Sequence, residues 1–99
     1  MLNITKNLTD DQATVLLEGR LDTVTAPNLE AELKEILPHA HTLVFDFEKL
    51  EYISSAGLRV LLAAQKRMAK EGEMKVVHVG ETIMEIFEVT GFSEILTIE

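Results

Sequence analysis

The sequence contains no cysteine, which excludes disulfides, thiolate metal sites and cysteine nucleophiles. It has no apolar run of about 18 residues, the length that a membrane-spanning helix needs. Its first residues lack the basic and then apolar pattern of a signal peptide. Basic residues are scarce, with nine Lys and Arg against seventeen Asp and Glu. Because nucleic acids and anionic membranes both attract clustered positive charge, we expect this chain to bind neither directly, and we expect a cytoplasmic protein.

The composition indicates an ordinary globular protein. Its 99 residues suffice for a single domain, residues 1–99, that buries a core without disulfides or metals. Hydrophobic residues make up 46% and charged residues 26%. The net charge of −8 is uneven, because residues 81–99 hold five acids and no base while basic residues gather in residues 59–75. Two solvated helix faces explain this pattern, and a surface that faces a charged partner is the alternative.

Apolar periodicity and turn residues predict elements in the order β-β-α-β-α-β-α-β. Strands are expected at residues 2–5, 13–17, 42–47, 74–79 and, as a short last piece, 96–98. The first helix is expected to follow Thr25 and to stop at Pro38. The second begins at two adjacent serines and runs for about four turns. The third follows Gly80 and ends at Gly91 in a left-handed conformation.

This order predicts an α/β fold with a mixed sheet. The first two strands form an antiparallel hairpin with the second strand further inside, and the later βα units impose parallel pairing with right-handed crossovers. Ligands and partners of such sheets meet the edge where strands end and helices begin. Two connections lie at that edge, residues 19–25 and residues 52–57.

Residues 50–68 are the segment around which the chain is organised. An apolar strand leads through a short acidic turn to Ser54 and Ser55, where the second helix begins. A serine oxygen at this point can accept a hydrogen bond from an N–H group of the first turn, which the helix leaves unpaired. The same N–H groups and the helix dipole favour anions and phosphoryl groups.

The sequence gives little indication of a catalytic site or a metal site. A hydrolase would need one of the two serines beside a base, but the glycine that opens a Gly-x-Ser-x-Gly elbow is absent, and His78 is expected to pack within a strand. His39 and His41 could share a face and bind a metal, but no third ligand lies near them in the sequence. Neither glycine-rich phosphate-binding motif occurs. We therefore expect no catalytic residue, no metal and no cofactor.

The segment of residues 54–57 has two interpretations. Two serines followed by small residues suit a capped helix that packs tightly, without any further role. Alternatively, Ala56 and Gly57 keep the surface flat, so that the active site of another protein can reach a serine hydroxyl. Phosphorylation of that hydroxyl would add about −1.5 to −2 charges and could break an interface packed against it.

Residues 50–62 resemble the signature of the STAS domain, as found in bacterial anti-sigma-factor antagonists. Residues 17–22, 44–47 and 90–92 extend the resemblance over almost the whole chain. It implies a STAS-like mixed sheet and a protein that is not an enzyme. Two positions depart from the family pattern: Ser54 stands where aspartate is common, and Ala56 where serine or threonine is common. The family commonly ends in a further helix, which we expect to be missing here, leaving sheet surface exposed.

The resemblance implies a phosphorylation-controlled partner switch. In the family, the unphosphorylated antagonist binds an anti-sigma factor that is also a serine kinase, phosphorylation releases it, and a serine phosphatase resets it. The family register places the phosphate acceptor two residues before Gly57, at Ser55, and Ser54 is a second candidate hydroxyl. The partner-binding site would then consist of Asp22, Thr23, Ser54, Ala56, Gly57, Leu58 and Arg59.

Two other functions stay open at this point. STAS-like domains also serve as scaffold subunits of membrane transporters or lipid-transport ATPases, where no phosphate is involved. A sensor of small ligands or nucleotides is the third option, because the strand-end edge can hold anions. A homodimer is likewise left open by the sequence.

Overall fold

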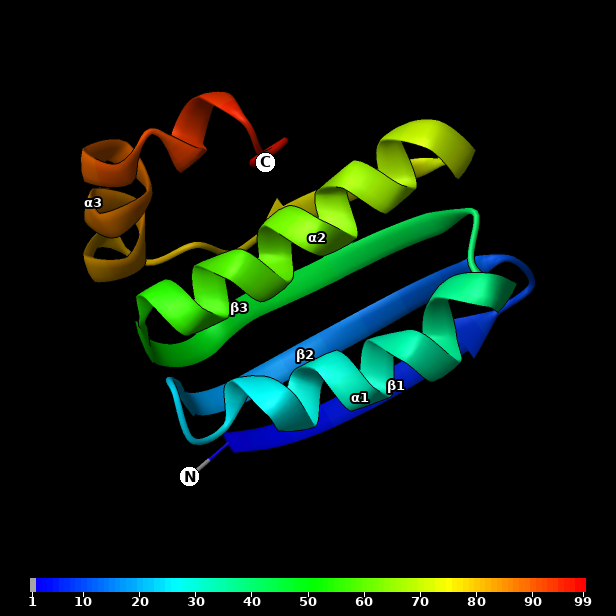
Figure 1. Cartoon of the computed structure of the whole chain (residues 1–99), viewed down its shortest axis with the longest axis horizontal. Helices are drawn as coiled ribbons and strands as arrows, with labels where there is room; N and C mark the ends of the chain where they lie inside the picture. Colours follow the sequence, from blue (N-terminus) through cyan, green and yellow to red (C-terminus); the bar gives the residue numbers. More distant parts are fainter. Residues whose placement is uncertain (1) are drawn as a thin grey trace.

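A computed structural model describes residues 2–99, and Met1 lies outside the described residues. Four strands form one sheet in the order β1-β2-β3-β4 (Figure 1). They are β1 (Leu2–Thr9), β2 (Gln12–Leu21), β3 (Thr42–Ile53) and β4 (Glu73–Val77). The pair β1 and β2 is antiparallel, and β3 pairs in parallel with both β2 and β4. The predicted mixed sheet, with its hairpin and its inner second strand, is confirmed.

Three helices connect and follow these strands: α1 (Ala26–Ile36), α2 (Ser55–Glu71) and α3 (Glu81–Thr90). Single 3-10 turns follow the first and the last of them, η1 (Leu37–His39) and η2 (Phe92–Glu94). Helix α3 ends at Gly91 with a left-handed φ of 83°, as the sequence predicted. The predicted last strand is reduced to a single parallel bridge between Ile98 and Val76, and residues 95–99 form no helix.

Strands β2 and β3 are longer than the sequence predicted, and the expected acidic turn before α2 is wrong. Residues 48–51 belong to β3, which continues to Ile53 because Leu50 and Ile53 are buried while Glu48, Lys49 and Glu51 face solvent. The partner strand continues as well, with register shifts after Leu16 and after Gly19. These irregularities let two long strands stay paired while the sheet twists.

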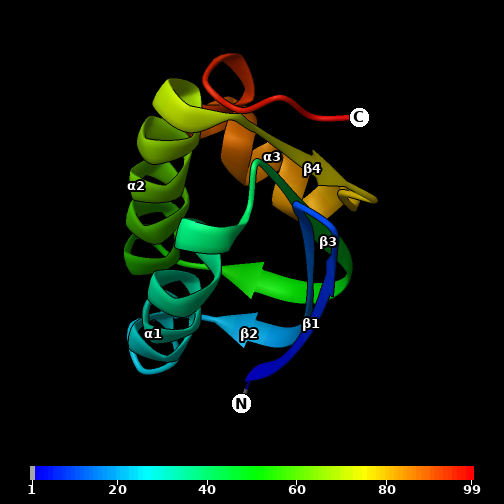
Figure 2. The same ribbon diagram turned by 90° about the vertical axis from the view of Figure 1, so that its right-hand side faces the viewer.

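Two of the three helices pack on one face of the sheet. Helices α1 and α2 lie side by side across it, and the opposite face carries no helix (Figures 1 and 2). Helix α3 reaches the same core, since the rings of Phe87 and Phe47 lie 6.3 Å apart between centroids. Burial alternates along β2 in agreement with a sheet that is covered on one face: Val15 and Leu17 are buried, and Leu16 between them is exposed.

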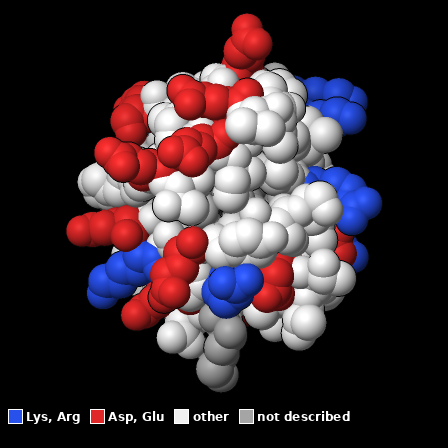
Figure 3. Space-filling view, turned by 90° about the vertical axis from the view of Figure 1, so that its left-hand side faces the viewer, with Lys and Arg blue, Asp and Glu red and all other residues white. Residues whose placement is uncertain are grey.

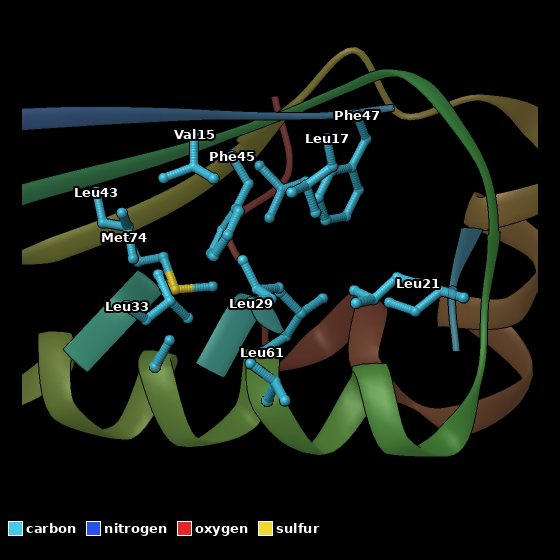
Figure 4. Close-up of a cluster of buried hydrophobic side chains, with 14 of the residues drawn as sticks. Val15, Leu17, Leu21, Leu29, Leu33, Leu43, Phe45, Phe47, Leu61 and Met74 are labelled. Atoms are coloured by element: carbon cyan, nitrogen blue, oxygen red, sulfur yellow. The ribbon is translucent and has the colours of Figure 1, made fainter. Parts of the chain in front are cut away.

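The core lies between this sheet face and the helices (Figure 4). Each labelled side chain comes from an alternating strand position or a helical stripe: Val15, Leu17, Leu21, Leu29, Leu33, Leu43, Phe45, Phe47, Leu61 and Met74. In α2, Val60 and Ala64 are buried while Ala69 is exposed. Helix α1 contacts α2 as well, so α2 packs against both the sheet and α1.

Two glycines allow the close approaches that place α2. A Cβ atom at Gly57 would lie 2.7 Å from Leu21 Cγ and 2.9 Å from Ile53 Cγ1, so only glycine lets the first turn of α2 touch the ends of β2 and β3. At the other end of the helix, a Cβ atom at Gly72 would lie 1.8 Å from the carbonyl oxygen of His41. The helix is therefore fixed against the sheet at both ends.

We predict that Gly57→Ala lowers the free energy of unfolding by about 1–3 kcal/mol, because the added methyl group overpacks the contact with Leu21 and Ile53. Urea unfolding of both proteins measures the difference. Gly80→Ala is the control, since a Cβ atom there meets nothing within 4 Å. That change should cost less, through the modest preference for glycine over alanine at an N-cap. Equal losses in the two variants would contradict the steric explanation.

Candidate functional site

The candidate site lies where β2 and β3 end and α1 and α2 begin. Parallel pairing brings the two strand ends to one edge, and the N–H of Ser54 donates to the carbonyl of Leu21 at 2.9 Å. The two connections that the sequence placed at this edge are thus joined directly. Both helices start there side by side (Figure 1).

The connection from β2 to α1 is a rigid turn built around Asp22. Its Oδ1 accepts hydrogen bonds from the N–H groups of Val24 at 3.0 Å and Thr25 at 3.1 Å. Thr25 precedes the first helical residue, as predicted, but its hydroxyl does not cap α1. Instead, Thr25 Oγ1 accepts from the N–H of Asp22 and donates to the carbonyl of Arg20. The turn is closed by side chains on both of its sides.

These hydrogen bonds lower the pKa of the Asp22 carboxyl below its usual value of 3.8. The main cause is the N–H of Thr25, and the Thr25 hydroxyl, the N–H of Val24 and the positive charge of Arg20 act in the same direction. Each of these favours the ionised carboxylate, and partial burial opposes them. Asp22 is therefore a structural anion of the site.

Arg20 and Tyr52 form a second feature of this edge, which sequence reasoning missed. They are register partners on β2 and β3, and the guanidinium carbon of Arg20 lies 4.4 Å from the centre of the Tyr52 ring. Such a cation-π contact holds the arginine in place. Arg20 Nε also lies 3.8 Å from Asp22 Oδ2. The predicted strands ended before these positions, so no pairing could be expected.

The two serines differ in accessibility. Ser54 occupies the N-cap position of α2, but it makes no capping hydrogen bond, and its buried Oγ has no hydrogen-bond partner in residues 2–99. The expected capping role is therefore wrong for Ser54, whose hydroxyl is covered by the protein. Ser55 is the first residue of α2 and is exposed.

The remaining predicted residues divide between the surface and the core. Gly57 and Leu58 are buried, so their contribution is packing of the first helical turn. Thr23 and Arg59 are exposed, and both line a shallow groove of about 270 Å³ between the two helices. The groove is bordered by Thr23, Ala26, Pro27, Glu30, Ala56, Arg59 and Val60. Thr23, Ala56 and Arg59 thus lie together at one groove, and Ala56 is the residue that follows Ser55 in the sequence.

An exposed valine also stands in the turn. Val24 is 81% exposed, although valine is usually buried. Nothing in the sequence distinguishes it from a core residue. Figure 3 looks onto this end of the molecule and shows uncharged surface in the middle, several acidic side chains gathered at the upper left, and basic side chains at the right, at the lower left and in the lower centre. The edge therefore offers apolar and charged surface together.

The histidines form no catalytic arrangement with the serines. His78 lies just after β4, exposed and with a left-handed φ of 58°, so the expectation of a packed strand residue is wrong. Its Nδ1 pairs with Asp46 Oδ1 at 3.0 Å. Together with Glu48 they form a group of three side chains of kinds that can bind a metal, and their ligand atoms lie within 4.8 Å of one another. The pairing itself already explains the geometry, because it ties the end of β4 to β3.

His39 and His41 are both exposed near the start of β3, and no potential metal group in residues 2–99 includes either of them. Among the helices of the same residues, none has the length and the apolar character that crossing a membrane requires.

Comparison with known proteins identifies the family. The model of the family described as "Mlab, STAS domain" matches residues 4–97. The chain belongs to the STAS domain family. BtrV of Bordetella bronchiseptica, whose name is that of an anti-sigma factor antagonist, is 32% identical to this STAS domain. The alignment covers 98% of this chain and 85% of that relative.

Solved structures share the fold of this STAS domain. An anti-sigma factor antagonist from Mycobacterium paratuberculosis is 26% identical with a TM-score of 0.89, over 99% of this chain and 85% of that one. Unphosphorylated SpoIIAA, also an anti-sigma factor antagonist, is 18% identical with a TM-score of 0.84, over 98% and 88% of the two chains. The Bacillus SpoIIAA is also known in a phosphorylated form, with a TM-score of 0.76. The predicted STAS-like fold is confirmed.

The turn around Asp22 should lose stability in acid. The pKa of the Asp22 carboxyl is lower in the folded protein than in the unfolded chain. Its contribution to stability is therefore complete above the unfolded pKa near 3.8 and is lost as the pH falls through the lower folded pKa. We expect the amide proton shifts of Val24 and Thr25, followed by NMR, to move with a midpoint below 3.8. Asp22→Asn keeps an oxygen acceptor but cannot titrate, so this transition should be absent. Its persistence in that variant would assign it to another group.

Proposed function

We propose that this STAS domain is an anti-sigma-factor antagonist that works as a phosphorylation-controlled partner switch. In its unphosphorylated form it binds an anti-sigma factor that is also a serine kinase. Phosphorylation of Ser55 by that kinase releases it, and a serine phosphatase restores the binding form. The family and the anti-sigma factor antagonists among its relatives support the general role.

The contrast between the two serines carries the assignment of Ser55. A kinase must reach the hydroxyl of its substrate, and the oxygen of Ser54 is covered by the protein whereas Ser55 is exposed. Ser55 also stands in the first turn of α2, where the helix dipole tolerates a phosphate. The added charge is therefore harmless to the fold and acts on whatever binds at this edge.

A partner that binds here would meet a preformed surface. The turn that bears Thr23 and Val24 is held by the Asp22 hydrogen bonds, and α2 is held by its contact at Gly57. Preformed surfaces lose little conformational entropy on binding. A phosphate introduces about two negative charges into that contact, which would leave the partner's buried groups facing uncompensated charge.

The first test identifies the phosphorylated residue. Incubation with the cognate kinase and ATP, followed by peptide mass spectrometry, should place one phosphate on Ser55. Ser54→Ala should be phosphorylated to the same extent, whereas Ser55→Ala should not be phosphorylated, and the phosphatase should remove the group. Phosphate found on Ser54 alone would defeat the assignment.

The second test measures the switch itself. Ser55→Asp should weaken kinase binding by about tenfold or more in calorimetry, because it adds charge to the contact. Ser55→Ala should bind nearly as well as the wild type, since it removes only an exposed hydroxyl. Equal affinities of the two variants would count against charge as the switch. A pull-down from the source cell identifies the partner, and recovery of a membrane ATPase instead of a kinase would favour a scaffold role.

A further inference from the structure

Arg59 stands one helical turn after Ser55. The two residues are four apart on α2 and both are exposed. Side chains at this spacing lie on one face, with Cβ atoms about 5–6 Å apart. Side chains on a helix also lean toward its N-terminus, so a long residue covers the turn that precedes it. An arginine at position 59 can therefore reach the turn that contains Ser55.

The charge of Arg59 is not paired within residues 2–99. Within residues 2–99, the ion pairs of the arginines are those of Arg20 with Asp22 and of Arg67 with Glu71, and Arg59 forms none. Arg59 borders the groove between α1 and α2 together with Glu30, without an ion pair to it. An exposed cation without an anion is therefore available beside the proposed phosphate acceptor.

We propose, as a step that rests on the function above, that Arg59 is the positioning residue that holds the phosphate of phosphorylated Ser55. A planar guanidinium can donate two parallel hydrogen bonds to phosphate oxygens, which a point charge cannot do. The N–H groups at the start of α2 also favour an anion there. The phosphate would then lie along α2 in one defined position.

This contact gives a single modification two effects on the surface. It places negative charge at the edge, and it removes the one unpaired arginine of the groove from contact with a partner. An acidic group on the partner that used Arg59 would lose it at the moment when the phosphate appears. The change in binding would therefore exceed that expected from added charge alone.

The experiment needs no kinase. Phosphoserine is introduced at position 55 by genetic encoding, and the second phosphate ionisation is followed by ³¹P NMR against pH. That ionisation ordinarily has a pKa near about 6, and an arginine in contact favours the doubly charged form. We expect Arg59→Gln to raise this value by about 0.2–0.7 pH units, the range typical of an exposed ion pair. Arg59→Lys should keep part of the difference.

Arg67→Gln is the matched control, because Arg67 lies on the same helix, is already paired with Glu71 and is three turns away. It should leave the ³¹P titration unchanged, and circular dichroism checks that each variant folds. The proposal would be overturned if the phosphate pKa were the same with Arg59 and with Arg59→Gln in the chain that carries phosphoserine at position 55. An equal shift of that pKa in Arg67→Gln would overturn it too. A failure of the kinase to modify Ser55 would instead overturn the proposed function and would leave this measurement unaffected.

Discussion

The contact between the first turn of α2 and the ends of β2 and β3 is the constraint on which the rest of this molecule depends. Gly57 allows the helix backbone to touch Leu21 and Ile53, and the N–H of Ser54 is bonded to the carbonyl of Leu21. A bulkier residue would move the start of the helix outward. The orientation of both serines, the groove beside α1 and the position of Arg59 all follow from this one approach.

The same contact decides which hydroxyl is presented. Successive residues at a helix start point in directions about 100° apart, so the two adjacent serines meet different surroundings. Ser54 is turned toward the protein and leaves its oxygen without a partner, at a cost in free energy of unfolding. Ser55 faces outward. Selection between two chemically identical groups is thus made by packing.

The sequence predicted the element order, the hairpin and the left-handed end of α3 because these depend on local features. Apolar spacing marks the helices, and Gly91 has no side chain to oppose its positive φ. The candidate edge was predicted for the same reason, since parallel strands end together. The signature in residues 50–62 then singled out Ser55, which the structure leaves exposed.

The features that could not be predicted from the sequence depend on pairing between residues far apart in the chain. Charged residues at positions 48, 49 and 51 interrupt the apolar pattern of β3, so its length appears only when bulged pairing with β2 is known. The contact of Arg20 with Tyr52 depends on that register and was missed with it. The burial of the Ser54 oxygen and the exposure of His78 are tertiary outcomes too. In each case the local pattern left several structures open, and the packing selected one.

One-sided packing explains why a chain of this size keeps its functional groups at an edge. The core is closed by α1, α2 and α3, whose buried side chains pack against those of the sheet. The rim where strands pass into helices stays accessible, and there backbone N–H groups, a rigid turn and an exposed hydroxyl meet. Such a rim cannot enclose a substrate, but it can be covered by another protein. A charge placed at its centre is then felt most strongly, because the covering partner excludes the water that would otherwise screen it.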